Sequence, residues 1–416
     1  MNRRAIEAGS VPAAIEAIAR ADGGRLLSHL VGDIRDFQLA EDSLQDALES
    51  ALIHWGRNGL PASPQGWLMQ TARRKAIDRL RRASNFRVKS VEIAQLIELE
   101  NQSDEEVYMG PIADERLKLI FICCHPALDR KTCVALTLRS VCGLKTEEIA
   151  DAYLDGHDAM AQRLVRARHK ITKAGIAYEV PEPDGWAERL ESVLAVIYLT
   201  FNEGYASGSE AHIRANLCEE AIRLGRLLKD LCPWEAEVEG LLALMLLHHA
   251  RRVARLGPSG EIVSLEDQKR KLWDRVLIDE GAALVDMALR RGRAGPYQLQ
   301  AAIIALHSEA PSFGETDWQQ IAALYRALAT TAENPVFELN RIVAISYAES
   351  AERALSMLGP LAQALAQYQP FHAVRADLLV RTGGHEEARA AYKSAIALSQ
   401  SNAEKLFLAA KMQALG

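Results

Sequence analysis

Hydrophobic residues recur at steps of three and four along most of this chain, which is the spacing of amphipathic helices. Residues 40–55 are the clearest case, with an apolar stripe of Leu44, Ala47, Leu48, Ala51, Leu52 and Trp55. A loop with a glycine and two prolines follows, and residues 65–82 are predicted to form a second helix. Beyond residue 186, no stretch alternates apolar and polar residues between turn signals. The pattern predicts an all-α protein.

Breaks in this pattern divide the 416 residues into several parts. The stretch after the second helix is rich in Glu and Asp, which predicts an acidic linker. The next part has three or four short helices separated by Pro126, Gly143 and Gly156, a rhythm typical of a helix-turn-helix domain. Prolines and a glycine between 181 and 185 mark a further boundary. The predicted parts are 1–89, the linker 90–114, 115–177, 186–333 and 334–416.

The last part has an internal period of 34 residues, the length of a tetratricopeptide (TPR) repeat. Two pairs of residues are separated by it: Ala354 with Ala388, and Leu361 with Ala395. Ala388, Tyr392 and Ala395 match the small–aromatic–small core of such a repeat, although Gln400 stands where many repeats have proline. The pattern predicts two TPR-like repeats near the C-terminus.

Composition narrows the class of protein. Apolar residues make up 49% and charged residues 25%, values typical of globular proteins. The first ten residues lack the apolar core of a signal peptide, and no uninterrupted apolar run is long enough to span a membrane. Six cysteines without CxxC spacing favour reduced thiols over disulfides. We therefore expect a cytoplasmic protein with no membrane partner and no cofactor.

The net charge of −6 is unevenly distributed. Residues 1–175 carry a net +1 and residues 176–416 a net −7. Within the first part, residues 73–89 hold eight basic residues and one acid, Asp78, and residues 163–173 hold five basic residues and no acid. Two compact basic clusters on a near-neutral domain indicate a polyanionic partner.

The first basic cluster falls on the predicted helix 65–82. Its apolar residues are expected to pack inward: Trp67, Leu68, Ala72, Ile77 and Leu80. Its basic residues are expected to project outward: Arg73, Lys75, Arg79, Arg81 and Arg82. This arrangement suits a helix lying against nucleic-acid phosphates. The alternative is a salt-bridged surface helix, which is disfavoured because Asp78 is the only acid within the helix.

The preceding predicted helix carries polar residues beside its apolar stripe: Glu41, Asp42, Gln45 and Asp46. Such a face either docks a partner protein or is a solvated surface. From these residues alone, the solvated surface is the favoured interpretation.

Residues 144–171 predict two helices joined by a turn near Asp155-Gly156. In the second helix the apolar residues share one face: Met160, Leu164, Ala167 and Ile171. The residues between them are expected to be exposed: Gln162, Arg163, Arg166, Arg168 and Lys170. A second helix with a free polar face is how helix-turn-helix proteins read the major groove.

Two groups of motifs, one following the other along the chain, resemble those of a known family. The first comprises Ala40-Glu41-Asp42, Gln45-Asp46, Trp67-Leu68, Ala72-Arg73 and Ala76-Ile77-Asp78 with Leu80-Arg81-Arg82. The second comprises Gly143-Leu144, Glu147-Glu148-Ile149-Ala150, Arg163-Leu164 and Arg166-Ala167-Arg168. They resemble regions 2 and 4 of extracytoplasmic-function (ECF) sigma factors, across about residues 20–175. From Trp186 onward, including residues 198–207, the chain resembles the extension of the ECF subgroup with TPR-like C-terminal domains.

The resemblance implies an alternative sigma factor that binds core RNA polymerase and directs promoter-specific initiation, without catalysis of its own. It implies contacts with the β′ clamp helices for Glu41, Asp42, Gln45 and Asp46. It implies contacts with the −10 element of promoter DNA for Trp67, Arg73, Arg74, Arg79, Arg81 and Arg82. Region 4 would contact the β flap and read the −35 element through Gln162, Arg163 and Arg166, while the linker threads the RNA channel.

Two departures from the family pattern fall in the second group. Lys145 stands where the family usually has a small capping hydroxyl, and Thr146 is the expected substitute. The turn Leu154-Asp155-Gly156-His157-Asp158 is also unusual, because it places an acid where an apolar residue normally packs. Either the turn is rebuilt or reading of the −35 element is altered.

Several alternatives stay open. Cys123, Cys124 and His125, with Cys133 and Cys142 nearby, also fit a zinc site, but adjacent cysteines rarely chelate one ion, and buried packing residues are favoured. An enzyme would use Glu203, His248, His249 and His307, which have no nucleophile–base spacing. Residues 202–205 either bind a small effector or cap a helix, and the cap is favoured.

The extension raises two further points. We expect it to regulate the N-terminal module, with a regulatory protein or a small effector as its partner. The alternative to the sigma factor is a helix-turn-helix regulator, or a TPR-type scaffold, that never joins polymerase.

Overall fold

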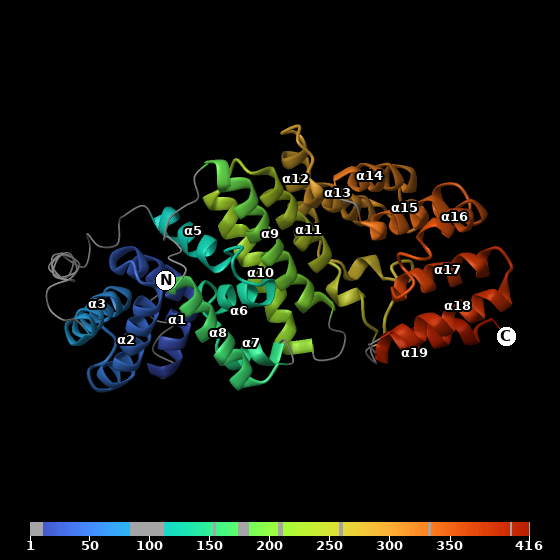
Figure 1. The fold of residues 1–416 in the computed structure, drawn as a ribbon. Coiled ribbons are helices and arrows are strands. Elements are labelled where there is room, and N and C mark those ends of the chain that lie inside the picture. The colour runs from blue at the N-terminus through green and yellow to red at the C-terminus, as the bar shows by residue number, and fades with distance from the viewer. Residues whose placement is uncertain are drawn as a thin grey trace. The chain divides into compact units, whose positions relative to one another are not determined.

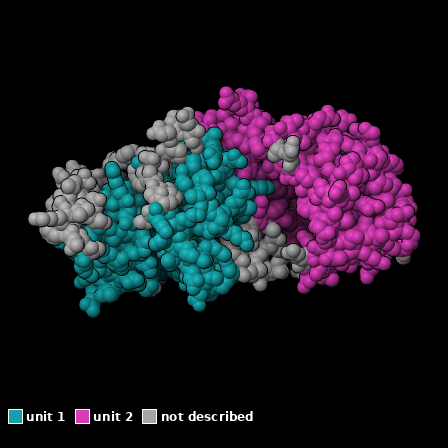
Figure 2. All heavy atoms as spheres, in the orientation of Figure 1, with its two compact units in different colours: residues 1–200 teal, residues 201–416 magenta. Residues whose placement is uncertain are grey.

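The protein forms two compact units, Met1–Thr200 and Phe201–Gly416 (Figure 2). The computed structural model describes residues 11–83, 112–152, 155–173, 183–206, 211–257, 261–331, 334–399 and 402–415. Apart from one isolated bridge between Leu256 and Ile262, the described residues contain no β structure. The predicted all-α fold is confirmed.

The N-terminal unit begins with three long helices that pack on one another and continues with shorter ones (Figure 1). Its helices are α1 (Val11–Ile34), α2 (Phe37–Asn58), α3 (Pro64–Ala83), α5 (Ile112–Cys123), α6 (Arg130–Ser140), α7 (Thr146–Ala152), α8 (His157–Lys173) and the first part of α9 (Pro183–Ala206). The predicted acidic linker lies outside the described residues, except for residues 112–114, which belong to α5.

Local sequence sets the limits of α2. The Asp36 carboxylate caps its first turn by accepting the Leu39 N–H at 3.0 Å. Gly59, at φ +78°, ends the helix, and its N–H donates to the Trp55 carbonyl. The predicted apolar stripe is narrower than expected, because Leu52 is 45% exposed. α2 packs mainly against α1 and α3, and Leu52 lies at an edge of the stripe that these helices leave in solvent.

The first part of α9 belongs to the N-terminal unit, although the sequence places a boundary just before it. The Trp186 ring meets the Phe121 ring edge-on at 5.1 Å, and Arg189 donates to the Phe121 carbonyl at 2.7 Å. Val193 is fully buried. The start of the extension therefore completes the packing around α5.

The C-terminal unit consists of short helices arranged mainly as antiparallel neighbours (Figure 1). After the end of α9 its helices are α10 (Ala211–Leu231), α11 (Ala236–His249), α12 (Arg275–Leu289), α13 (Pro296–Glu309), α14 (Trp318–Thr331), α15 (Pro335–Ala348), α16 (Ala351–Met357), α17 (Gln369–Arg381), α18 (His385–Leu398) and α19 (Asn402–Gln413). Residues 241–247 of α11 are all buried, so this helix forms the centre of its bundle. A Cβ on Gly240 would lie 2.7 Å from the Gln298 backbone nitrogen, so α11 and α13 pack too closely there for a larger residue.

The two predicted repeats differ in regularity. In the second, Ala388, Tyr392 and Ala395 are buried in α18 between α17 and α19. In the first, α16 already ends at Met357, and a 3₁₀ turn, η5 (Gly359–Leu361), follows. The proline in that turn has no N–H to continue an α-helix. The TPR assignment therefore remains a prediction that suits α17 and α18 best.

Replacing Trp186 tests whether α9 completes the N-terminal unit. Trp186→Ala is expected to lower that unit's free energy of unfolding by about 2 kcal/mol, because the indole packs on Phe121. Trp234, which is 58% exposed, supplies the matched control, and Trp234→Ala should cost less than about 1 kcal/mol. Calorimetry of both full-length variants measures the difference, and equal losses would contradict the assignment.

Candidate nucleic-acid interface

Two tryptophans join α2 to α3. Trp55 is buried, and the half-buried Trp67 ring meets it edge-on at 5.4 Å. The His54 ring lies 5.4 Å from Trp67 as well. Trp67 is therefore held in place at the start of α3 with part of its ring in solvent.

One arginine of α3 clamps the acids of α2. Arg79 donates to the Asp42 carboxylate at 3.0 Å and to the Asp46 carboxylate at 2.8 Å. All three side chains are roughly one-third exposed, so the network lies at the surface. The sequence assigns these residues to two separate partners, whereas the structure joins them to each other. Gln45, on the same helix, is exposed.

Glu41 is buried beneath α8. Its carboxylate accepts a hydrogen bond from Arg168 Nη2 at 2.7 Å, and Arg168 Nε lies 2.7 Å from its second oxygen. Arg139 of α6 is 3.9 Å away. Burial raises the pKa of the Glu41 carboxyl, against the opposing effect of these two cations. Glu41, which the resemblance assigns to the polymerase contact, is therefore covered by α8, the helix predicted to read DNA.

Arg73 does not face outward with the other arginines of α3, as the sequence analysis predicts. Its side chain is 5% exposed and makes two hydrogen bonds with Asp33 of α1, at 2.9 and 2.8 Å. The prediction that Arg73 projects outward is therefore wrong. The position lies on the inner face of α3 beside Ala72, and an acid on α1 neutralises the charge there.

The remaining arginines of α3 are accessible. Arg74, Arg81 and Arg82 are exposed, and no ion pair joins Arg81 or Arg82 to another described residue. The last two lie in the final turn of α3, where a positive charge is favoured by the helix dipole. This end of α3 is the accessible part of the predicted cluster.

The second basic helix, α8, has the predicted inner face, but the prediction that Arg168 is exposed is wrong, because its side chain is 17% exposed against Glu41. Met160, Leu164, Ala167 and Ile171 are buried. Gln162 and Arg166 are exposed and pair with no described residue, whereas Arg163 is paired with Asp155 at 2.6 Å. This ion pair accounts for the unexpected acid in the turn and lowers the pKa of Asp155.

Glu148 caps the start of α7, a role that the sequence analysis did not assign to it. The Lys145 N–H donates to the Glu148 carboxylate at 2.7 Å. The Lys145 ammonium lies 2.8 Å from Glu16 of α1, and Arg20 of α1 lies 2.9 Å from Glu148. Lys145 stands where the family has a capping hydroxyl, and its side chain instead forms an ion pair with Glu16 of α1.

Two glycines bring α1 and the segment between α6 and α7 into close contact. A Cβ on Gly24 would lie 2.4 Å from the Val141 carbonyl oxygen. A Cβ on Gly143, which has φ +73°, would lie 2.8 Å from the Ala19 carbonyl oxygen. Together with the Glu41 pair, these contacts hold α1–α3 directly against α6–α8.

Three exposed apolar side chains were missed by the sequence reasoning. Leu52 and Ile53 on α2 are 45% and 62% exposed, and Val165 on α8 is 56% exposed. Leu52 was assigned to the core because it fits a helical stripe, and periodicity alone does not reveal which edge of a stripe is covered. Exposed apolar residues beside polar ones mark candidate contact surfaces.

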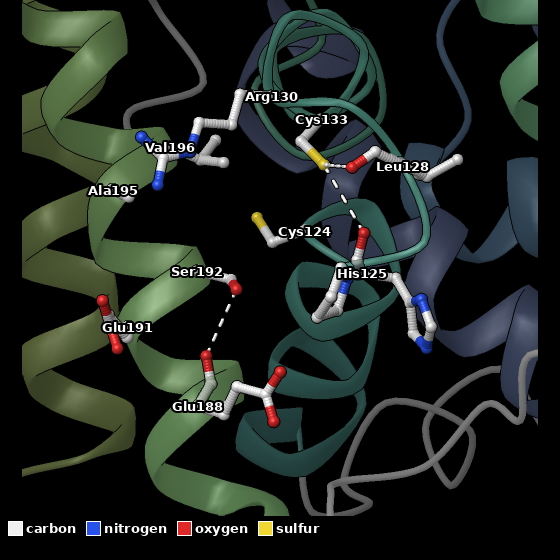
Figure 3. A pocket seen from close by; sticks show the side chains of 11 residues that line it. Cys124, His125, Leu128, Arg130, Cys133, Glu188, Glu191, Ser192, Ala195 and Val196 are labelled. Atoms are coloured by element: carbon white, nitrogen blue, oxygen red, sulfur yellow. Dashed lines mark hydrogen bonds between the residues drawn. The ribbon is translucent and has the colours of Figure 1, made fainter.

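Cys124, just after α5, and Cys133 of α6 border a cavity of about 260 Å³ (Figure 3). The Cys133 thiol donates to the His125 and Leu128 carbonyls at 3.7 and 3.8 Å, and the Cys124 sulfur lies 3.5 Å from the Thr137 hydroxyl. Burial raises the pKa of Cys124 to about 12 and that of Cys133 to about 11. Among the described residues no His, Cys, Asp and Glu cluster has the arrangement of a metal site. The buried thiols of Cys124 and Cys133 pack against their neighbours and contact polar groups there.

The polar segment at the end of α9 lies inside the helix. The Tyr205 hydroxyl and His248 Nδ1 are 3.0 Å apart, and Arg255 donates to the Tyr205 carbonyl at 2.9 Å. The Arg255 guanidinium also covers the Tyr205 ring at 3.6 Å. Burial lowers the pKa of His248 well below its ordinary value, and Arg251 and Arg255 add to this shift. Residues 202–205 are part of α9, so the interpretation that they cap a helix is wrong; Arg255, which the sequence did not single out, binds the carbonyl at the helix end instead.

Comparisons with known proteins match two separate segments of the chain. Residues 20–86 match sigma-70 region 2, and residues 189–289 match a family of unknown function, DUF6596. An uncharacterized protein of Rhizobium meliloti (strain 1021) is 43% identical over 378 residues, covering 90% of this chain and 89% of that protein. No solved structure matches the chain.

Two further findings bear on the class of protein. None of the described helices combines the length and the apolar character that a membrane span requires. The helices α2 and α3, which carry the acids and the exposed arginines, fall within the region 2 match. The chain therefore belongs to one family with the Rhizobium meliloti protein and, through its region 2 domain, to the sigma-70 family of transcription initiation factors.

Proposed function

We propose that this protein is an ECF-type sigma factor whose α2 docks on core RNA polymerase, whose α3 engages the −10 element and whose α8 reads the −35 element. The observation that carries the proposal is the region 2 match over a helix with exposed, unpaired arginines at its end. A helix-turn-helix regulator that never joins polymerase is the alternative. It would bind duplex promoter DNA by itself.

The docking surface on α2 is proposed to be its outer face. Gln45, Glu49, Leu52 and Ile53 are exposed there at helical spacing. Asp42 and Asp46 border this face but are held by Arg79. An apolar patch rimmed by polar residues is typical of a protein contact surface, so the two aliphatic side chains would supply most of the binding energy.

For α8 we propose that Gln162, Val165 and Arg166 face DNA. Gln and Arg form hydrogen bonds with base edges or phosphates, and an exposed valine is suited to the methyl group of thymine. Arg163, which Asp155 holds, would then position the turn. Arg168 is committed to Glu41 while α8 lies on α2.

The same contact supports a proposal about access to polymerase. While Arg168 pairs with Glu41, α8 covers one end of α2. Binding to polymerase and to both promoter elements requires α2 and α8 to act at separate places. We therefore infer that the contact between α2 and α8 opens when the protein joins core enzyme.

Regulation by the C-terminal extension is proposed to act through α9. The start of α9 packs on α5 through Trp186 and Arg189. Because α9 continues past Thr200 into the C-terminal unit, the extension is covalently linked to the helix that packs on α5. A regulatory protein or small effector acting on the extension would have a direct route to this module.

Removing two exposed arginines tests the promoter contact. Arg81→Ala combined with Arg82→Ala is expected to reduce open-complex formation about tenfold and to lower the salt-dependence slope by about two, because each arginine neutralises a phosphate. Core binding should be unchanged. The control is Arg290→Ala with Arg293→Ala, which removes the same charge from exposed positions of the C-terminal unit. Loss of core binding, or open-complex formation as efficient as in the control variant, would contradict the assignment.

Removing two exposed aliphatic side chains tests the docking face. Leu52→Ala with Ile53→Ala should weaken binding to core enzyme at least tenfold, as expected for about 2 kcal/mol of lost apolar burial. Fluorescence anisotropy with labelled protein measures this affinity. Val276→Ala with Leu406→Ala, at positions 76% and 72% exposed, is the matched control and should bind normally. If the two double variants bind core enzyme with equal affinity, the proposed docking face is wrong.

Neutralising Glu41 tests the opening of α8 from α2. Glu41→Gln leaves Arg168 without its counter-charge, so the closed arrangement weakens and the apparent affinity for core enzyme should rise about fivefold. Glu280→Gln, which breaks the Arg226 pair in the C-terminal unit, should leave affinity unchanged. A drop in affinity would instead mean that Glu41 touches polymerase directly.

A further inference from the structure

A cavity of about 280 Å³ lies within the C-terminal unit. Its walls come from α13, α14, α15, α17 and α19 and from the segment around Glu266. Small-molecule sites are usually about 300–1,000 Å³, so this volume suits a ligand smaller than most drugs. Rings and aliphatic side chains line the wall beside six polar residues: Ser264, Glu266, His307, Asn340, Asp377 and Lys411. An occupant must therefore match both kinds of surface.

The apolar part of the wall is built on a cluster of three rings, Phe313, Trp318 and Tyr347. Trp318 and Tyr347 stack with centroids 4.5 Å apart, and Phe313 meets both of them edge-on at 5.0 and 5.1 Å. The Arg381 guanidinium lies over the Tyr347 ring at 4.4 Å and donates to the Ser346 hydroxyl at 2.9 Å. The rings hold one another in place, so this part of the wall suits a planar apolar group, whose offset or edge-to-face packing adds to simple burial.

Three polar side chains of the wall are available to a ligand. Glu266 and Lys411 are exposed, and Asn340 is half-buried. None of the three makes a hydrogen bond or an ion pair with another described residue, although the Lys411 ammonium lies over the Phe407 ring at 5.4 Å. The wall thus offers one carboxylate, one ammonium and one amide, which can both donate and accept.

The other polar residues leave the wall close to neutral. The Asp377 carboxylate lies 3.7 Å from the Arg381 guanidinium, which balances its charge. Burial lowers the pKa of His307 to about 4, so this side chain is uncharged near neutral pH. The charges of Glu266 and Lys411 remain, one of each sign. A simple cation or anion would be matched by one of them and repelled by the other, whereas a zwitterion is complementary to both.

We propose that this cavity binds a small zwitterion, an α-amino acid with a planar apolar side chain. The side chain packs against the three-ring cluster, the ammonium pairs with Glu266, and the carboxylate accepts hydrogen bonds from Lys411 and Asn340. Charge-assisted hydrogen bonds of this kind are stronger than neutral ones and fix the orientation of a ligand. The site is independent of the proposed sigma factor activity, since binding is measured without polymerase or DNA.

The test uses three probes that share one ring and differ in their charges. L-Phenylalanine carries both charges, 2-phenylethylamine carries only the ammonium, and 3-phenylpropionate carries only the carboxylate. Isothermal titration calorimetry with the full-length protein is expected to give L-phenylalanine an affinity about fivefold above that of each single-charge probe, the effect of one ion pair at a partly exposed site. Equal affinities for the three probes would contradict the proposal.

Two variants assign the charges to residues. In Glu266→Gln, the affinities of L-phenylalanine and 3-phenylpropionate should differ by less than about twofold, because the ammonium has lost its partner. In Lys411→Met, L-phenylalanine and 2-phenylethylamine should become equally close, because the carboxylate has lost its cation. Asp286→Asn and Lys393→Met remove exposed charges outside the wall. These two matched controls should keep the preference of the wild-type protein for L-phenylalanine.

A third variant places the probe in the cavity. Val343 lines the wall, and Val343→Trp should fill the space and abolish binding of L-phenylalanine. Val276→Trp, at a position 76% exposed and outside the wall, is the matched control and should bind L-phenylalanine normally. Circular dichroism confirms that each variant is folded. The proposal is overturned if L-phenylalanine fails to bind wild-type protein, if Glu266→Gln and Lys411→Met keep the wild-type preference, or if folded Val343→Trp binds normally.

Discussion

The arrangement of the N-terminal unit depends on one buried ion pair. Glu41 of α2 and Arg168 of α8 meet at 2.7 Å, with Arg139 close by and little solvent around them. A buried pair adds little net stability, because desolvation offsets most of the attraction, but removing one partner leaves an uncompensated charge. Such a contact specifies one arrangement of two helix groups while costing little to open when both partners find water or another surface. That property suits the proposed opening of α8 from α2.

The arginines of α3 show how one sequence pattern yields three environments. Arg73 lies in the interior with Asp33, Arg79 clamps two acids of α2 at the surface, and Arg81 and Arg82 remain exposed in the last turn. The difference follows from helical geometry, since positions six to nine residues apart face different neighbours. Only the exposed end is available to a polyanion, so the promoter contact is confined to a smaller surface than the charge count implies.

The C-terminal unit handles polar groups differently. Arginines there bind helix-end carbonyls and cover aromatic rings, as Arg255 does at Tyr205 and Arg270 at the end of α13. Burial lowers the pKa of three histidines in this unit, His248, His249 and His307, and nearby arginines add to the shift. His307 stands apart because its buried Nδ1 has no hydrogen-bond partner among the described residues.

The sequence by itself determined the all-helical class, the order of the basic and acidic segments, the buried face of α8 and the likeness to region 2 that the comparisons confirm. These features depend on residues close together in the chain, where helical periodicity and capping act. Only the tertiary structure decided that Glu41 and Arg73 are buried, that Leu52 is exposed and that Arg79 is held by Asp42 and Asp46. Burial and ion pairing depend on which distant helix covers a given face, and a stripe of apolar residues does not identify its neighbour.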